Sequence, residues 1–498
     1  MGAVAAVFSK SQVDAPRLVA KMLCAMRHRA QDEVAVAWDR NFESASSPTR
    51  LLASSPMGHV ATGYGFTRIL SSDILQPIRA GEGWFCLDGR IVAERMLVGG
   101  EEARQLLERK LNPVQFPSIQ RDNEGPYSVY FCTDDRLLVT RDRLGLKPTF
   151  IGHRNDLVAV ASDRKALWAI GIHEIATFPP GGCLKASSTD MVVELSEPQA
   201  DKAQRSSDAE IGVDELLHSL VESVSIQTAG AGKIAVGFSG GVDSTVLAKI
   251  AKDTGADVLL VTVGLGRTPE MIQAESTAKQ IGLPIVVKKF SKGDLERYLD
   301  RVLWLIEEPS LMKVSIAVAI HWAAEVAVQN GCSLIMLGQG SDELFGGYKR
   351  FATILGKHGE RAALDAISES IRVAYEVNYQ RDDQAVSSLR AELRLPFATK
   401  RMTEIGSRVP LKMKVRSSSD HIRKWILREA AVRLGIPSRI AMRPKKAIQH
   451  ASGIEKAIRE IAKKHRLTPS TYLEDRLHNI KDELDANWSG ARLSVASY

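Results

Sequence analysis

The sequence has few cysteines, and none of them are arranged in pairs. Their number is odd and no CxxC motif occurs, which excludes a disulfide-built scaffold and a zinc site of the usual Cys/His spacing. We expect reduced, buried thiols in an intracellular protein. The five are Cys24, Cys86, Cys132, Cys183 and Cys332.

Aromatic residues and unbalanced charge are also scarce. Aromatic residues make up 6% of the 498 residues, and 66 basic against 59 acidic side chains leave a net charge of +7. A protein that acts on an RNA base or a tRNA would show a stronger basic field and more aromatics, so we expect no nucleic-acid partner. The basic residues gather in 400–446 and 456–464, which we interpret as solvated helix faces.

The sequence shows no signal peptide and no membrane-spanning segment that we recognise. The start, MGAVAAVFSK, lacks the basic segment and the longer apolar segment of a signal peptide, and we find no apolar run of membrane-spanning length. We therefore expect a soluble, cytoplasmic protein without a membrane partner.

What the sequence does contain is enough apolar material, 44%, for two or three domains. Up to residue 195, short apolar runs alternate with turn signals, which predicts a layered β-rich domain. Residues 196–208 are polar and aperiodic, as in a linker. The expected strands are 4–8, 34–38, 84–87, 128–132, 137–140 and 157–162, with helices at 15–26 and 101–109.

From residue 209 to 498 the pattern changes to apolar strands separated by helices. Such continuous apolar strands predict a parallel, doubly wound α/β sheet, and everything after residue 355 reads as nearly all helical. Ligands bind such sheets beyond the carboxyl ends of the strands. The expected strands are 233–238, 257–263, 284–288 and 334–337, and the helices are 211–227, 242–251, 269–280 and 316–328.

The strongest motif is SGGVDS, at the turn from the first of these strands into its helix. Gly240 and Gly241 let backbone N–H groups close around an anion, and Ser239 and Ser244 add hydroxyl donors at the helix N-terminus. The Lys-Ser/Thr of a P-loop is missing, so this is another kind of phosphate pocket.

A carboxylate inside an anion pocket requires a cation. Asp243 lies within the first motif, and Asp342 lies in GQGSDELFGG (338–347), just past the fourth strand. Mg²⁺ binds one or two carboxylates together with phosphate oxygens, so we predict that both residues hold Mg²⁺ beside ATP. Further on, Arg443 and Lys445 could stabilise charge on departing pyrophosphate, although a basic surface turn fits their spacing equally well.

In order, these motifs resemble glutamine-dependent asparagine synthetases and their relatives, over nearly the whole chain. The resemblance rests on SGGVDS (239–244), IEEPS (306–310), GQGSDELFGGY (338–348), 381–397 and RPK (443–445), and in the first half on RDRLGLKP (141–148) and SDRKAL (162–167).

The resemblance implies an N-terminal-nucleophile-type glutaminase domain and an ATP-pyrophosphatase domain. Aspartate and ATP would form β-aspartyl-AMP, which ammonia attacks. Pyrophosphate would bind 239–244, including Val242, with Gly338 and Arg443 close by. Lys445 would stabilise the negative charge that develops on the departing pyrophosphate. Adenine would lie near Val236, Gly237 and Val263. The sequence does not decide between a monomer and a homodimer.

Two departures from the family qualify this. The family's catalytic cysteine after the initiator Met is Gly2 here, and its Asn-Gly pair is Asp88-Gly89, whereas Arg68 matches the arginine that would hold glutamine. We expect a folded but inactive glutaminase domain, with ammonia taken from solution or from a separate glutaminase subunit.

The second departure is Gln339, where asparagine synthetases commonly carry Glu and the β-lactam synthetase branch carries Tyr. A neutral amide cannot act as a base near the acyl-adenylate. Another carboxylate substrate, a β-lactam-type intramolecular closure, and a catalytically idle regulatory relative therefore remain open alternatives.

Overall fold

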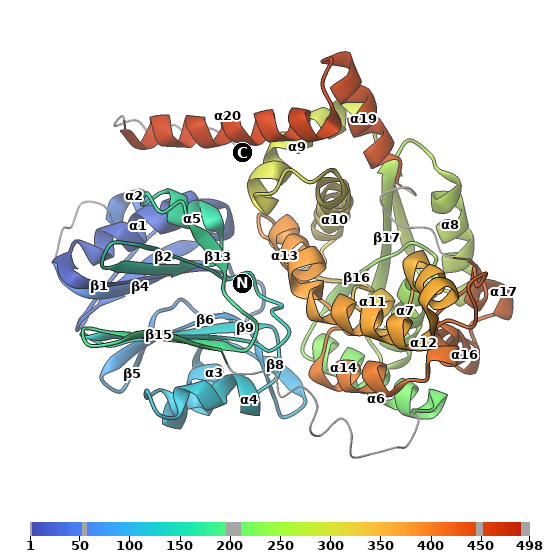
Figure 1. Ribbon diagram of the computed structural model, residues 1–498, viewed down its shortest axis with the longest axis horizontal. Coiled ribbons are helices and arrows are strands. Elements are labelled where there is room, and N and C mark those ends of the chain that lie inside the picture. Colours follow the sequence, from blue (N-terminus) through green and yellow to red (C-terminus); the bar gives the residue numbers. More distant parts are fainter. Residues whose placement is uncertain (1, 52–56, 196–210, 445–451, 490–498) are drawn as a thin grey trace. The chain divides into compact units, whose positions relative to one another are not determined.

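The computed structural model describes all residues except 1, 52–56, 196–210, 445–451 and 490–498. Backbone contacts divide the chain into two compact units (Figure 1). The first comprises 1–200, 387–390 and 481–498, and the second comprises 201–386 and 391–480. The predicted linker, 196–208, lies outside the described residues.

The first unit contains two antiparallel sheets, with strand orders β13-β11-β12-β1-β4-β2-β3 and β15-β14-β10-β9-β6-β5, and a β7-β8 hairpin. All eight predicted elements are present. Its strands are β1 Gly2–Val13, β2 Glu33–Trp38, β3 Asn41–Ala45, β4 Gly58–Phe66, β5 Ile78–Ala80, β6 Gly83–Gly89, β7 Ile91–Ala93, β8 Met96–Val98, β9 Tyr127–Cys132, β10 Arg136–Arg141, β11 Phe150–Arg154, β12 Leu157–Ala161, β13 Ile175–Thr177, β14 Gly182–Ser187 and β15 Met191–Leu195; its helices are α1 Ala15–Ala25, α2 Pro48–Leu51, α3 Gly100–Leu107, α4 Ile119–Asp122 and α5 Arg164–Trp168.

The first strand explains why this unit is layered. Ala3, Ala5 and Val7 pack against α1 and α5 on one face of β1, and Val4, Ala6 and Phe8 pack against the other sheet. Because successive side chains of a strand point to opposite faces, a strand between two apolar layers must be apolar at every position. Helices cover the outer face of each sheet, α1, α2 and α5 on one and α3 and α4 on the other (Figure 1).

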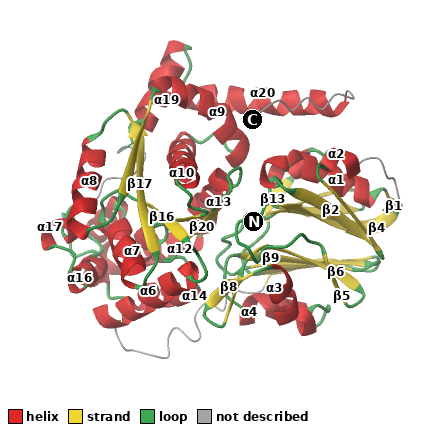
Figure 2. Ribbon diagram, turned by 180° about the vertical axis from the view of Figure 1, so that it is seen from behind, coloured by secondary structure: helices red, strands yellow, loops and turns green. Residues whose placement is uncertain are grey.

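The second unit contains a five-stranded parallel sheet in the order β18-β17-β16-β19-β20. Helices lie on both of its faces (Figure 2). Its strands are β16 Lys233–Gly237, β17 Asp257–Leu265, β18 Ile285–Phe290, β19 Leu334–Met336 and β20 Glu392–Arg394; its helices are α6 Val213–Thr228, α7 Val242–Asp253, α8 Pro269–Ile281, α9 Lys292–Ile306, α10 Leu311–Gln329, α11 Ser341–Leu344, α12 Lys349–Arg372, α13 Gln380–Val386, α14 Lys400–Arg408, α15 Leu411–Lys414, α16 Trp425–Arg433, α17 Ser438–Ala441, α19 Ile454–Lys464 and α20 Pro469–Ser489, whose last part falls in the first unit.

The order of the strands positions the site. Strands β16, β17 and β18 follow one another in one direction across the sheet, and the chain then returns to place β19 on the other side of β16. Connections that leave a parallel sheet in opposite directions open a crevice at the carboxyl ends of the two central strands. The loops after β16 and β19 carry residues 238–241 and 337–340, so both predicted motifs start at the carboxyl ends of these two central strands.

The region after residue 355 is nearly all helical, as predicted; the exception is β20, a fifth parallel strand whose three residues are too few to show a pattern. One prediction is wrong, namely that no apolar run reaches membrane-spanning length. The α10 segment is long and apolar enough, by length and composition, to cross a membrane. It packs against β16, β17, α9 and α13, and 67% of its most apolar 18-residue window is buried, as in the core helix of a soluble protein.

Candidate active site

The SGGVDS loop folds back on itself at the start of α7. The Ser239 N–H donates to Ser244 Oγ (3.3 Å), and the Gly241 N–H donates to Ser239 Oγ (3.3 Å). Gly240 has φ +68°, and a Cβ there would lie 3.0 Å from Ala274 Cα, so this position requires glycine. Ser239 stays exposed while Val242 and Ser244 are buried, which leaves the open side of the loop accessible to an anion.

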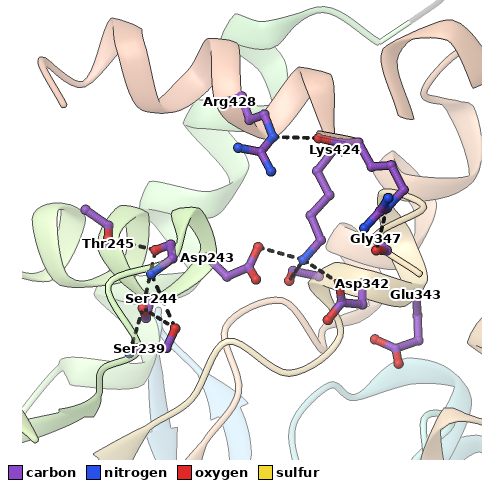
Figure 3. Close-up of polar contacts among 12 residues, drawn as sticks. Ser239, Asp243, Ser244, Thr245, Asp342, Glu343, Gly347, Lys424 and Arg428 are labelled. Atoms are coloured by element: carbon purple, nitrogen blue, oxygen red, sulfur yellow. Dashed lines mark hydrogen bonds and ion pairs between the residues drawn. The ribbon is translucent and has the colours of Figure 1, made fainter. Parts of the chain in front are cut away.

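Asp243 and Asp342 meet at one cation. Lys424 Nζ lies 2.7 Å from Asp243 Oδ1, 2.7 Å from Asp342 Oδ1 and 2.9 Å from the Ser341 hydroxyl, as Figure 3 shows for the two carboxylates. The lysine side chain is 2% exposed. Burial lowers the pKa of Lys424, while the neighbouring Asp243 carboxylate acts in the opposite direction. The structure thus brings together the two predicted carboxylates, from the ends of neighbouring strands, around a residue that sequence reasoning missed.

Lys424 is held in an unusual backbone conformation. Arg423 and Lys424 both have positive φ, 53° and 54°, directly before α16. Non-glycine residues in this left-handed region cost free energy, about 1–3 kcal/mol each, and cluster at functional sites. Gly347 lets Lys424 approach, because a Cβ there would lie 1.8 Å from Asp342 Oδ1 and 2.3 Å from Lys424 Cε.

Arg428 stabilises the backbone conformation of Arg423 and Lys424 through hydrogen bonds to main-chain carbonyl groups. Its guanidinium, 1% exposed, donates to the carbonyl oxygens of Ile422 (2.6 Å), Arg423 (2.6 Å) and Arg443 (2.9 Å). Burial lowers the pKa of Arg428 to about 10. One side chain therefore fixes the segment that presents Lys424 and the segment that leads to Pro444.

The basic stretch 400–446 is thus only partly a solvated face, and that interpretation is wrong for several of its members. Lys414, Arg423, Lys424 and Arg428 are all buried. Burial lowers the pKa of Lys414 to about 7, and its Nζ donates to the Gly406 carbonyl at 2.6 Å. A run of basic residues is recognised from composition alone, whereas the burial of each side chain depends on its tertiary contacts.

The remaining predicted ATP-site residues that the structure describes lie at the same edge. Arg443 Nη1 donates to Thr277 Oγ1 (3.1 Å) and to the Gly240 carbonyl (3.4 Å), beside the loop. Gly338 packs on Asp243, since a Cβ there would lie 3.0 Å from Asp243 Cβ. Lys445 lies outside the described residues. At the strand ends Gly237 and Val263 are partly accessible, whereas Val236 is fully buried.

Gln339 pairs with a carboxylate. Its Nε2 donates to Asp382 Oδ2 at 2.7 Å, and Arg381 Nε donates to Asp382 Oδ1 at 2.7 Å. Burial is the main cause that raises the pKa of Asp382, opposed by the Arg381 charge. A donor amide beside a carboxylate is a stable neutral–anion pair, in which a second carboxylate would be repelled.

Two neighbouring carboxylates supply the kind of oxygen ligand that Mg²⁺ takes together with phosphate oxygens. Because Lys424 Nζ occupies the point between their Oδ1 atoms, a metal would have to bind Asp243 and Asp342 from another side or displace the ammonium. The described part of the chain has no group of three or more His, Cys, Asp or Glu residues that could hold a metal by themselves. A metal at Asp243 and Asp342 would therefore depend on the polyphosphate of its substrate. When bound there, Mg²⁺ would supply positive charge to the phosphates.

In the first unit, Gly2, the position to which the resemblance assigns a nucleophile, leaves little room for a side chain. Gly2 pairs with Phe66 across β1 and β4, and a Cβ on Gly2 would lie 2.3 Å from Tyr64 Cζ and 2.7 Å from the Gly65 carbonyl oxygen. Asp88 is fully buried; it accepts from the Ser162 hydroxyl (3.0 Å) and lies 3.9 Å from Lys147 Nζ. Gly89 ends β6 with φ +106°.

Arg68 lies two residues beyond β4, with its guanidinium 5.8 Å from the Phe66 ring centroid. Cys24 lies within α1, where burial raises the pKa of its thiol to about 12, so it is a poor substitute nucleophile. The motifs at 141–148 and 162–167 stabilise the local structure of the first unit. In the first motif, Asp142 accepts a hydrogen bond from the Leu146 N–H (2.9 Å), and in the second, Asp163 pairs with the Arg29 guanidinium (2.9 Å).

Comparisons with known proteins show the family to which the chain belongs. The asparagine synthase family model matches residues 215–380 and 356–478. The chain is 31% identical over 389 residues to a putative glutamine-hydrolysing asparagine synthetase of Methanocaldococcus jannaschii, covering 69% of this chain and 72% of that protein. This chain belongs to the asparagine synthase family. As a member it is a carbon–nitrogen ligase, an ATP-dependent enzyme that forms amides.

A second relative shares a lower identity with this chain. Asparagine synthetase B of Escherichia coli is 24% identical over 357 residues, covering 68% of this chain and 63% of that protein. Among solved structures, the glutamine phosphoribosylpyrophosphate amidotransferase of B. subtilis, complexed with ADP and GMP, matches 58% of this chain and 81% of its own at 15% identity and a TM-score of 0.34. That score is too low to support an argument from its fold.

Proposed function

We propose that this ligase makes asparagine from aspartate, ATP and ammonia, with release of AMP and pyrophosphate. The observation that carries the proposal is the convergence of Asp243, Asp342 and Lys424 beside the SGGVDS loop. Serine hydroxyls and backbone N–H groups would receive the β- and γ-phosphates, while Lys424, Arg443 and Lys445 would stabilise the charge of departing pyrophosphate. The enzyme would work in the cytoplasm.

Magnesium would be held by Asp243 and Asp342, with the phosphates of ATP as its remaining partners. Adenine would lie against the ends of β16 and β17, where Gly237 and Val263 are accessible. Val236, being buried, could contribute only through its backbone.

We propose that the N-terminal unit is a vestigial glutaminase of the N-terminal-nucleophile type. Arg68, Asp88 and Gly89 would correspond to the glutamine-binding residues of an active glutaminase. The absent thiol at Gly2 and the Tyr64 ring beside it support this. Ammonia would then come from solution or from a separate glutaminase.

The test is to incubate the purified protein with Mg·ATP and aspartate, with ammonium in one reaction and glutamine in another, and to measure AMP, pyrophosphate and asparagine. We expect asparagine with ammonium and none with glutamine. Absence of pyrophosphate and asparagine in both reactions would contradict the aspartate assignment. Other amino acids would then be tested, because Gln339, which donates to Asp382, is a position where asparagine synthetases commonly carry Glu.

Restoring the missing thiol is expected not to restore glutaminase activity. In Gly2→Cys the new Cβ would collide with Tyr64, so we expect no glutamate release and a lowered melting temperature, by several degrees, from overpacking of about 1–3 kcal/mol. Differential scanning fluorimetry and a coupled glutamate assay measure both. Glutamine hydrolysis by this single variant would show that Tyr64 does not close the site.

A further inference from the structure

A second buried carboxylate lies next to Asp342 on α11. Glu343 is 2% exposed. Its Oε1 accepts from the Tyr348 hydroxyl and from Asn378 Nδ2 (2.7 Å), but its Oε2 has no hydrogen-bond partner among the described residues. Buried polar atoms without a partner are rare in folded proteins, and each calls for an explanation such as a bound ligand.

The Glu343 side chain is held in place by residues brought from elsewhere in the unit. Asn378 belongs to a π-helical turn, Tyr375–Tyr379, and such turns occur frequently at functional sites. Two donors on one oxygen orient the carboxylate and leave the other oxygen for a further donor. Figure 3 shows Glu343 beside Asp342, at the edge of the Lys424 centre.

Glu343 lies within electrostatic reach of both halves of the candidate site. Its charge acts on Lys424, at the carboxylate pair, and on Asp382, the partner of Gln339. Both oxygens of Asp382 already accept hydrogen bonds, one from Gln339 and one from Arg381. Glu343 Oε2 is therefore a buried acceptor without a hydrogen-bond partner among the described residues, on the residue next to Asp342, and its carboxylate acts electrostatically on both Lys424 and Asp382.

The negative charge and acceptor character of Glu343 Oε2 restrict the chemical groups that it can bind. A carboxylate oxygen accepts hydrogen bonds from N–H groups and repels phosphate and carboxylate groups. The described residues offer no three-carboxylate metal group that would include it. The proposed reaction contains two suitable nitrogen groups, the ammonia that attacks and the ammonium of the amino-acid substrate.

We propose that Glu343 Oε2 binds an amine nitrogen of the reactants and positions it beside the reacting carboxylate. The assignment rests on the proposed function. If the assignment holds, Glu343 favours reactants that place an N–H donor next to its Oε2 atom.

The test is Glu343→Gln. The glutamine carbonyl can still accept from Tyr348 and Asn378, but its NH₂ group replaces the open acceptor and cannot bind an N–H donor. We expect aspartate-dependent ATP–pyrophosphate exchange to retain a kcat near that of the wild type, while one KM rises about 10- to 100-fold, as for loss of a hydrogen bond to a charged group.

Two assays distinguish the source of the nitrogen. A raised KM for aspartate in the exchange reaction, which contains no ammonia, would assign the substrate's own ammonium. A raised KM for ammonium only, in asparagine formation, would assign the attacking nitrogen. Unchanged KM values would overturn the proposal, and so would a raised Mg²⁺ requirement with lost exchange, which would make Glu343 a metal ligand.

Glu296→Gln is the matched control, since it removes the same charge from an exposed position on α9. If Glu343→Gln does not fold, Glu343→Asp serves instead; it keeps the charge but withdraws the oxygen, and we expect the same KM to rise by a smaller factor. The wild-type enzyme in the same assays separates the two hypotheses. No exchange with any amino acid by the wild type would overturn the proposed function, whereas an active wild type and an unchanged variant would overturn only the role of Glu343.

Discussion

Asp243→Asn and Asp342→Asn are each expected to lower aspartate-dependent ATP–pyrophosphate exchange by about 10³-fold or more. Each substitution removes one of the two carboxylates that converge on Lys424. The protein thereby loses one of its two proposed Mg²⁺ ligands. Exchange measured over a range of Mg²⁺ concentrations should show a raised metal requirement in both variants. Because Lys424 keeps the other carboxylate and the Ser341 hydroxyl, we expect both to fold.

The matched control is Asp253→Asn, at the other end of α7. Asp253 is exposed and pairs with Lys249, so the same chemical change on the same helix should leave exchange and its metal dependence unaltered. Exchange within tenfold of the wild type in Asp243→Asn or Asp342→Asn, at unchanged Mg²⁺ dependence, would remove the basis for placing the metal there.

Lys424→Met is expected to lower the rate of exchange by about 10²- to 10³-fold, since a fixed cation next to the phosphate loop is lost. The methionine also leaves Asp243 and Asp342 facing each other without the ammonium between them. We therefore expect a lower melting temperature and a larger rise of that temperature on adding Mg²⁺ than in the wild type, because the metal would replace the missing charge.

Lys279→Met is the control for this variant, as Lys279 is an exposed lysine on α8 of the same unit. It should change neither exchange nor the response to Mg²⁺. A Lys424→Met variant with wild-type exchange would show that the lysine is a structural neutraliser of two acids rather than part of the reaction.

Much of the fold could be predicted because it follows from local patterns. The predicted boundaries of β16 and β19 agree with the structure to within one residue, since a buried parallel strand must be apolar at every position. The sequence also predicted that the SGGVDS and GQGSDELFGG motifs follow two strands of one parallel sheet, and in the structure these strands, β16 and β19, are neighbours. β20 was missed, since Glu392 and Arg394 form a buried ion pair with each other and so read as polar in the sequence.

The amino-acid sequence by itself predicted the layered first unit, the parallel sheet, the SGGVDS loop after the first strand and the two carboxylates, because each is marked by a local pattern or a short motif. Only the tertiary structure decided that Lys424, some eighty residues after Asp342, is the cation between them, and that Glu343 Oε2 is buried without a hydrogen-bond partner among the described residues. It also decided that Tyr64 covers Gly2. These facts depend on which distant side chains meet and on how deeply they are buried, and neither property has a period or a spacing that a sequence can display.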